Sequence, residues 1–115
     1  MPNYVENRPW GSFEILSDRV NFKVKILTVL PHKRLSLQSH KRRAENWVVA
    51  AGEALVTVDD ELLILSAGQH VAIPRQTKHR LENRGETDLI VIETQTGDYF
   101  GEDDITRYAD DFQRR

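Results

Sequence analysis

The chain has no cysteine, no excess of basic residues and no long apolar run. Without cysteine it can form no disulfide, no thiolate metal site and no cysteine nucleophile. Its 16 Lys and Arg against 18 Asp and Glu leave a net charge of −2, which argues against a nucleic-acid binder. No apolar stretch approaches the ~20 residues of a membrane span, and the N-terminus has no signal-peptide pattern. We therefore expect a cytoplasmic protein that binds neither nucleic acid nor membrane.

The length and composition are those of one ordinary globular domain. The chain has 115 residues, of which 39% are hydrophobic and 30% charged. A chain of this size buries enough surface for one core but not for two. The sequence contains no fixed-period repeat and no low-complexity tract. We therefore expect residues 1–115 to form a single domain, without a separate nucleotide-binding domain.

Short segments of alternating or β-branched character recur along the chain, and none has the period of a helix. They predict strands over residues 13–16, 22–30, 35–40, 47–52, 54–58, 62–65, 70–74 and 89–95. Pro31 and Pro74 end two of these strands, and the acidic residues 59–61 indicate a hairpin tip. Strands at about ten-residue spacing indicate an all-β antiparallel sandwich or barrel. The polar tail from about residue 101 could form a short helix or an ordered extension.

Four polar side chains stand at the ends of these predicted strands. Gln38 and His40 point to the same face of one strand, because side chains alternate with a period of two. Glu45 lies just across the following turn, and His79 precedes a later strand. One amide oxygen, two imidazoles and one carboxylate suit a divalent cation. Because no thiolate is present, we expect a single ion of zinc, manganese, cobalt, nickel or iron.

Ordinary structural roles compete with these functional interpretations. A single histidine on a strand is more often a packed or solvated residue than a ligand, and we interpret His32 and His70 in that way. The basic run at residues 41–43 is either a solvated turn or an anion-binding segment beside the metal. Trp10 and Trp47 are most simply core residues.

The segment Leu35–Val49 contains the pattern Gln-x-His-x-x-Arg-Ala-Glu and resembles the signature of the type II phosphomannose isomerases. These proteins belong to the cupin superfamily, whose two-part signature also resembles the spacing of Gly52, Gly68, Pro74 and His79. The resemblance spans about residues 6 to 110. Its other matching pieces are Arg8–Gly11, Phe22–Lys25, Ile73–Pro74, His79–Asn83, Ile92–Gly97 and Gly101–Arg107.

This resemblance implies a cupin-type antiparallel β-barrel, also described as a double-stranded β-helix or jelly roll. It implies a metal-dependent isomerase of carbohydrate metabolism and polysaccharide biosynthesis that interconverts mannose 6-phosphate and fructose 6-phosphate. The implied metal ligands are Gln38, His40, Glu45 and His79. In this family the domain usually forms the C-terminal part of bifunctional mannose-1-phosphate guanylyltransferase/mannose-6-phosphate isomerase proteins. The glycine-rich phosphate loop of the nucleotidyltransferase half is absent from the chain.

Such an isomerase needs a group that moves a proton next to the sugar carbonyl, and cations that bind the phosphate. Glu93 is the predicted proton shuttle, because a carboxyl on a mostly apolar barrel wall has a raised pKa. The alternative is that Glu93 reaches solvent at its strand end. Arg107 is predicted to act near the reacting end or the phosphate. Arg43, Lys25 and Lys33 are further candidates for binding the sugar phosphate, with a purely solvated role as the alternative for Lys33.

Two other classes of function compete with an isomerase. A non-catalytic metal-binding cupin would bind or sense a small sugar or acid without converting it. An iron(II) oxygenase could use the same fold, but Gln38 stands where such enzymes mostly have a histidine. A small open barrel exposes edge strands and apolar faces that a second copy can cover, so we also expect a homodimer.

Overall fold

The computed structural model describes residues 4–113, and within them every regular element is a β-strand. The expected hairpin tip after residue 58 is present between two paired strands, and Asp59 adopts a left-handed conformation there, with a φ of 51°. The strands are β1 (Tyr4–Arg8), β2 (Gly11–Asp18), β3 (Phe22–Val29), β4 (Leu37–Ser39), β5 (Arg43–Ala51), β6 (Glu53–Val58), β7 (Glu61–Ser66), β8 (His70–Ile73), β9 (His79–Asn83), β10 (Leu89–Gly97) and β11 (Thr106–Ala109).

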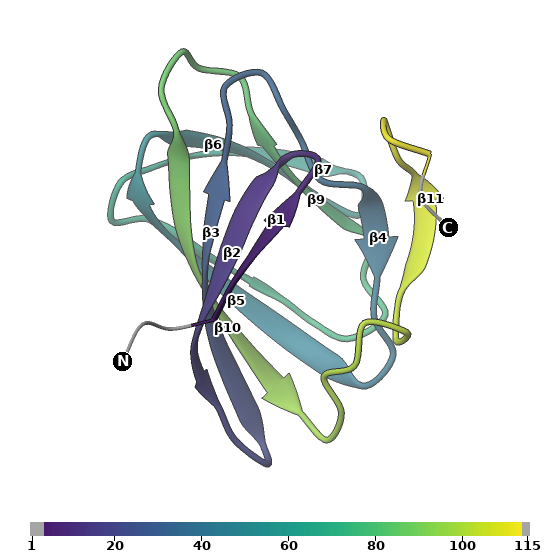
Figure 1. Cartoon of the computed structure of the whole chain (residues 1–115). Coiled ribbons are helices and arrows are strands. Elements are labelled where there is room, and N and C mark those ends of the chain that lie inside the picture. Colours follow the sequence, from purple (N-terminus) through teal and green to yellow (C-terminus); the bar gives the residue numbers. More distant parts are fainter. Residues whose placement is uncertain (1–3, 114–115) are drawn as a thin grey trace.

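The strands form two antiparallel sheets around one interior, as Figure 1 shows. The first sheet has six strands in the order β1-β2-β3-β10-β5-β8, and the second has five in the order β11-β4-β9-β6-β7. The chain changes sheet between β3 and β4, so sequence neighbours such as β4 and β5 lie in different sheets. This arrangement confirms the predicted all-β antiparallel barrel.

The interior has an apolar end and a polar end, and both follow from the alternation of side chains along each strand. On the first sheet, the odd-numbered residues of β3, β5 and β10 face inward. At one end of these strands they are apolar and join the core, which includes Val29, Val49, Leu89 and Val91. Toward the other end they become polar. The inward polar residues are Lys25, Arg43, Glu45, Glu93 and Gln95, all of them buried.

The polar end is held in register by a close approach between β10 and the start of β5. Gly97 pairs with Arg43, and a Cβ at residue 97 would lie 2.2 Å from the carbonyl oxygen of Arg42. Its φ of +154° is also one that other residues rarely adopt. Only glycine lets the two backbones meet here, which places the first residues of β5 over the interior.

Of the two alternatives for the C-terminal tail, the structure has the ordered extension and not the short helix. Residues 106–109 form strand β11, which pairs with β4 at the edge of the second sheet (Figure 1). The hydroxyls of Tyr108 and Ser39 hydrogen-bond at 2.9 Å, and Arg34 donates to both oxygens of Asp111. An exposed strand edge offers unpaired backbone groups, and β11 satisfies those of β4.

The N-terminal region also differs from expectation. The sequence predicted a single strand over residues 13–16, whereas β1 and the longer β2 form a hairpin there. Polar residues dominate β1, which lies at a sheet edge, and that explains why its pattern was not recognised. Along residues 4–113 the structure contains no helix that could cross a membrane.

Candidate metal centre and pocket

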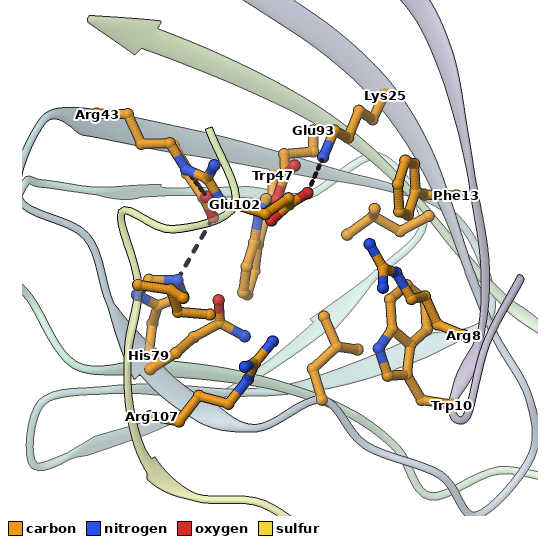
Figure 2. Close-up of a pocket in the computed structure, with 15 residues that line it drawn as sticks. Arg8, Trp10, Phe13, Lys25, Arg43, Trp47, His79, Glu93, Glu102 and Arg107 are labelled. Atoms are coloured by element: carbon orange, nitrogen blue, oxygen red, sulfur yellow. Dashed lines mark hydrogen bonds and ion pairs between the residues drawn. The ribbon is translucent and has the colours of Figure 1, made fainter. Parts of the chain in front are cut away.

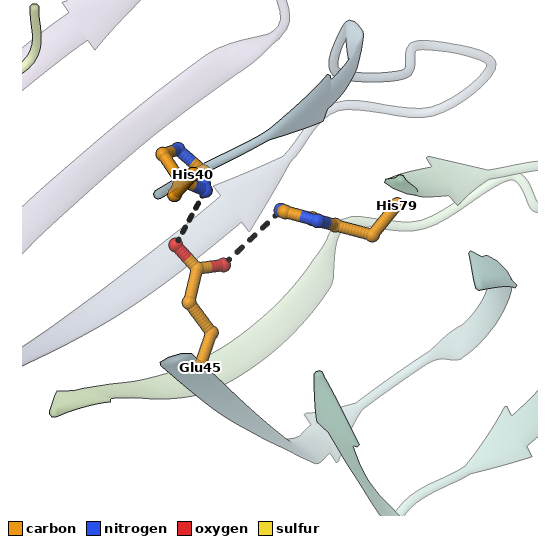
Figure 3. A group of neighbouring side chains, drawn as sticks. All are labelled: His40, Glu45 and His79. Carbon is orange, nitrogen blue, oxygen red and sulfur yellow. Dashed lines mark ion pairs between the residues drawn. The ribbon is translucent and has the colours of Figure 1, made fainter. Parts of the chain in front are cut away.

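Three side chains with metal-ligating atoms meet at the polar end of the interior. His40 directly follows β4, Glu45 lies on β5, and His79 begins β9. Each is at most 5% exposed, and one ligand atom from each lies within 4.8 Å of the others. Figure 3 shows both imidazoles directed at the carboxylate of Glu45. The predicted convergence of these three residues is therefore present in the structure.

The hydrogen bonds of His79 leave one ring nitrogen directed at the carboxylate. Its Nδ1 donates to the carbonyl oxygen of Thr77 at 2.9 Å, and its Nε2 lies 3.4 Å from Oε1 of Glu45. In a neutral imidazole with this bond, the proton is on Nδ1 and the lone pair is on Nε2. A backbone carbonyl that orients a histidine in this way is a common feature of metal ligands.

The electrostatics of the three groups favour a cation between them. Burial works to raise the pKa of Glu45, but the hydrogen bond and charge of His79, with Arg43 and His40, hold it well below its usual range. Burial lowers the pKa of His40 to about 4, although Glu45 partly opposes this. Burial also works to lower the pKa of His79, yet its bond to Glu45 raises it. The result is a buried carboxylate anion beside a neutral His40.

Arg43 is the fourth member of this cluster. Its Nε donates to Oε2 of Glu45 and its Nη2 donates to Nε2 of His40, both at 2.9 Å. Because a guanidinium only donates, the lone pair on Nε2 of His40 is engaged by Arg43. The buried Nδ1 of His40 and Nη1 of Arg43 have no hydrogen-bond partner. Arg43 therefore donates hydrogen bonds to the lone pairs that a metal ion would use.

The residues present fit a divalent cation. Two imidazoles and one ionised carboxylate are a donor set that suits zinc and other first-row metals. When Nε2 of His40 accepts from Arg43, the ring proton is on Nδ1, which lies 3.6 Å from Oε2 of Glu45 without a hydrogen bond, so a metal would bind His40 through Nε2. Gln38 adjoins the cluster, because its Cα is paired with that of His79. Its amide nitrogen donates to the hydroxyl of Ser36 at 3.0 Å.

A pocket opens from this cluster across the polar end of the barrel, and Figure 2 shows its lining. Glu93 lies at its base, where Oε2 accepts from Nε1 of Trp47 at 2.9 Å and Oε1 accepts from Nε2 of Gln95 at 2.7 Å. Burial, with repulsion from Glu45, raises the pKa of Glu93 to about 7. The expected solvent-exposed alternative is wrong, because Glu93 is only 5% exposed.

The opposite side of the pocket is rich in cations and aromatic rings. Lys25 lies 4.2 Å from the ring centroid of Phe13 and 3.3 Å from the carboxylate of Glu102. Arg8 lies 5.3 Å from the same ring, and its guanidinium points into the pocket in Figure 2. Burial works to raise the pKa of Glu102, but the charge of Lys25 lowers it. This side can therefore receive an anionic group.

Eight of the nine predicted site residues line this pocket or belong to the group formed by His40, Glu45 and His79. The exception is Lys33, which is exposed in the loop between β3 and β4 and does not line the pocket. Its backbone bonds to Leu30 and Asn83 fix it at the apolar end of the barrel. The eight are Lys25, Gln38, His40, Arg43, Glu45, His79, Glu93 and Arg107.

Other pocket residues were not predicted. Arg8 and Glu102 carry charges into it, and Trp10 and Trp47 line it as well as joining the core, as expected of them. Both charged residues lie in segments that matched the family pattern, Arg8–Gly11 and Gly101–Arg107. The family resemblance could have pointed to these two residues, but the spacing of residue types alone gave no reason to place them in the site.

Comparison with known proteins identifies the family. A family model described as the mannose-6-phosphate isomerase C-terminal domain matches residues 3–110. The chain belongs to this family. It is 48% identical over 107 residues to the alginate biosynthesis protein AlgA of Pseudomonas aeruginosa and 47% identical to the xanthan biosynthesis protein XanB of Xanthomonas campestris. It is 42% identical to the mannose-1-phosphate guanylyltransferase of Escherichia coli.

The lengths of these relatives correct the expected function. Each alignment covers 93% of this chain but only 22–23% of the relative. The chain corresponds to the C-terminal cupin domain of much longer proteins, whose names describe the whole molecule. The expectation that this chain by itself interconverts mannose 6-phosphate and fructose 6-phosphate is therefore wrong as a description of the chain.

Solved structures confirm the cupin fold. The chain superimposes with a TM-score of 0.75 on an RmlC-like cupin from Shewanella frigidimarina, at 20% identity and covering 88% of this chain and 87% of that one. The capsular polysaccharide assembling protein CapF of Staphylococcus aureus gives 0.81 at 21% identity, over 95% of this chain and 32% of CapF. Identities this low establish the fold alone.

Proposed function

We propose that this cupin domain binds one divalent metal ion and a sugar phosphate in the same pocket. His40, Glu45 and His79 hold the metal, with Gln38 completing the protein ligands. The observation that carries the proposal is the convergence of three buried ligating groups, two of which, Glu45 and His79, line a pocket rich in cations. Zinc, manganese, cobalt, nickel and iron(II) all suit this set of nitrogen and oxygen donors.

The cations of the pocket support an anionic ligand. Lys25 is buried, and Arg43 and Arg107 line the same cavity. A buried cation is stable only when it is paired. The partner of Lys25 is the carboxylate of Glu102, which a phosphate can replace. A guanidinium group binds phosphate through two parallel hydrogen bonds, whereas a lysine ammonium attracts phosphate as a point charge. A metal held by His40, Glu45 and His79 would supply a Lewis acid for the hydroxyl or carbonyl oxygens of the sugar.

Glu93 supplies a group that can exchange a proton with a bound sugar. A carboxyl with a pKa of about 7 can both accept and donate a proton near neutral pH. Its two oxygens are fixed by Trp47 and Gln95 at the base of the pocket. It is therefore placed to contact a hydroxyl of the bound sugar.

Isothermal titration with Co²⁺ tests the metal site. We expect one ion per chain for the wild type, and at least a tenfold loss of affinity for His40→Ala, since one of three strong ligands is removed. His70→Ala is the matched control, because His70 lies exposed on β8. Equal loss in both variants, or retention in His40→Ala, contradicts the assignment.

Titration of the cobalt-loaded protein with mannose 6-phosphate and with mannose tests the ligand. We expect the phosphorylated sugar to bind more tightly, and Lys25→Met to remove most of that preference. Equal affinity for the two sugars contradicts an anion-binding role. Because metal binding is measured separately, failure of the sugar experiment leaves the metal assignment standing.

A further inference from the structure

Residues 98–105, which we call the strap, join β10 to β11 at the polar end of the barrel, where the pocket opens (Figure 1). The strap contains no helix or strand. Its residues Glu102 and Ile105 line the pocket, and Figure 2 shows the side chain of Glu102 directed at Lys25. The strap therefore carries a negative charge into the site from outside the two sheets.

The ion pair between Glu102 and Lys25 joins a movable group to a fixed one. Nζ of Lys25 lies 3.3 Å from Oε1 of Glu102. The side chain of Lys25, on β3, is only 5% exposed, whereas that of Glu102 is 53% exposed. A half-exposed carboxylate can turn into water, but a buried ammonium must keep a partner. Glu102 is therefore the member of the pair that can leave.

Both ends of the strap are tied to Arg42, in the turn between β4 and β5. Asp98 accepts a hydrogen bond from Nε of Arg42 at 3.3 Å, and Asp104 accepts one from its backbone nitrogen at 2.9 Å. The ring of Phe100 is also buried. None of these contacts involves Glu102, so its carboxylate can leave the pocket while the strap stays attached.

Three cations attract the carboxylate of Glu102. Burial works to raise its pKa, but the charges of Lys25, Arg43 and Arg8 hold the pKa below its usual range. Lys25 and Arg8 also lie near the ring of Phe13, at 4.2 and 5.3 Å from its centroid. An ammonium and two guanidinium groups that attract one carboxylate provide a setting that suits a phosphate as well.

The cavity is small while Glu102 remains in it. Its volume is about 110 Å³, whereas pockets that hold small organic ligands measure about 300–1,000 Å³. A lining side chain must therefore move before a sugar phosphate fits. Withdrawal of Glu102 enlarges the cavity at the place where the charge of Lys25 needs a new partner.

We infer that Glu102 is an internal anion that occupies the place beside Lys25 until a phosphate ligand displaces it, and that it thereby makes the site selective for anions. The inference rests on the anionic ligand proposed above. A phosphate monoester carries a charge of about −1.5 to −2 at neutral pH and offers three acceptor oxygens, so the exchange leaves Lys25 paired with more charge. A neutral sugar brings no charge, and its entry in place of Glu102 would leave a buried ammonium unpaired.

Isothermal titration with inorganic phosphate, with EDTA present, tests the inference independently of the metal. We expect Glu102→Gln to bind phosphate about fivefold more tightly than the wild type, because the competing side chain has lost its charge. Glu61→Gln is the matched control, since it removes the same charge at an exposed position on β7. Its affinity for phosphate should equal that of the wild type.

Unchanged or weaker phosphate binding in Glu102→Gln, or equal tightening in both variants, overturns the inference and leaves the anion-binding role standing. If neither the wild type nor Glu102→Gln binds phosphate, the anion-binding role fails and the inference fails with it. Circular dichroism verifies that the variants are folded. Glu102→Asp replaces Glu102→Gln if the latter is not folded, and it should also tighten phosphate binding because its shorter side chain reaches Lys25 less well.

Discussion

The buried carboxylate of Glu45 is the residue on which the polar end of the barrel depends. His40, His79 and Arg43 all approach it, and each supplies a donor or a positive charge. Removing water from a carboxylate is costly unless such partners replace it. Arg43 is the permanent cation among them. A metal ion that uses Nε2 of His40 must therefore displace one of the hydrogen bonds of Arg43.

Replacing Arg43 tests this competition. We expect Arg43→Gln to tighten Co²⁺ binding about fivefold, because the guanidinium no longer occupies the lone pairs of His40 and Glu45. Isothermal titration measures the change, and Arg42→Gln is the control, since Arg42 is exposed and contacts Asp98. Weaker or unchanged cobalt binding in Arg43→Gln would show that Arg43 supports the metal instead of competing with it.

Glu93 makes stability depend on pH. Its pKa is about 7 in the folded protein against 4.5 ordinarily, so the folded state holds the proton more tightly. The resulting stabilisation is complete below about pH 4.5 and is lost as the pH rises through 7. Between pH 5 and 8 we expect the free energy of unfolding to fall by about 2 kcal/mol relative to Glu93→Gln. Urea denaturation with EDTA present measures it, and parallel pH profiles would contradict it.

At the scale of elements, the alternation of side chains along a strand explains the parts of the site that were predicted from the sequence. Side chains two residues apart share a face, so Gln38 and His40 were placed together, and the turn after them brought Glu45 back beside them. The same alternation along β10 placed Glu93 with Gln95. Alternation does not determine which strands share a sheet. The tail became β11 because β4 offered an open edge, a contact between residues about 70 apart in sequence.

The turn that leads from β4 to β5 depends on the C-terminal segment. The carboxylate of Asp104 accepts hydrogen bonds from the backbone nitrogens of Lys41 and Arg42, at 3.1 and 2.9 Å. These two residues directly follow His40. The segment therefore fixes the position of a metal ligand through the backbone beside it.

Replacing Asp104 with alanine should loosen this turn. We expect a loss of about 1 kcal/mol in the free energy of unfolding, in line with the loss of ordinary hydrogen bonds, and a weaker affinity for Co²⁺. Urea denaturation and titration measure the two effects. Asp60→Ala, at the hairpin tip between β6 and β7, is the control. Unchanged cobalt affinity in Asp104→Ala would show that the turn holds His40 without this segment.

For the whole molecule, local patterns indicated the fold class and the family, while the detailed site required the closed barrel. Lys33 and Arg8 illustrate the difference. Arg8 ends strand β1 and Lys33 lies in the loop after β3, but the fold carries Lys33 to the apolar end and Arg8 to the pocket. Their positions depend on contacts between distant segments, which no local pattern contains. The hydrogen bonds of Arg43 to His40 and Glu45 are equally invisible in the sequence.

The proposed site requires three distant side chains to hold one cation, and an anomalous difference map tests this most directly. Crystals grown with Co²⁺ and measured at the cobalt edge should show one strong peak per chain between His40, Glu45 and His79. A map with its strongest peak elsewhere, or with no peak although the three side chains are well ordered, would contradict the proposed metal site.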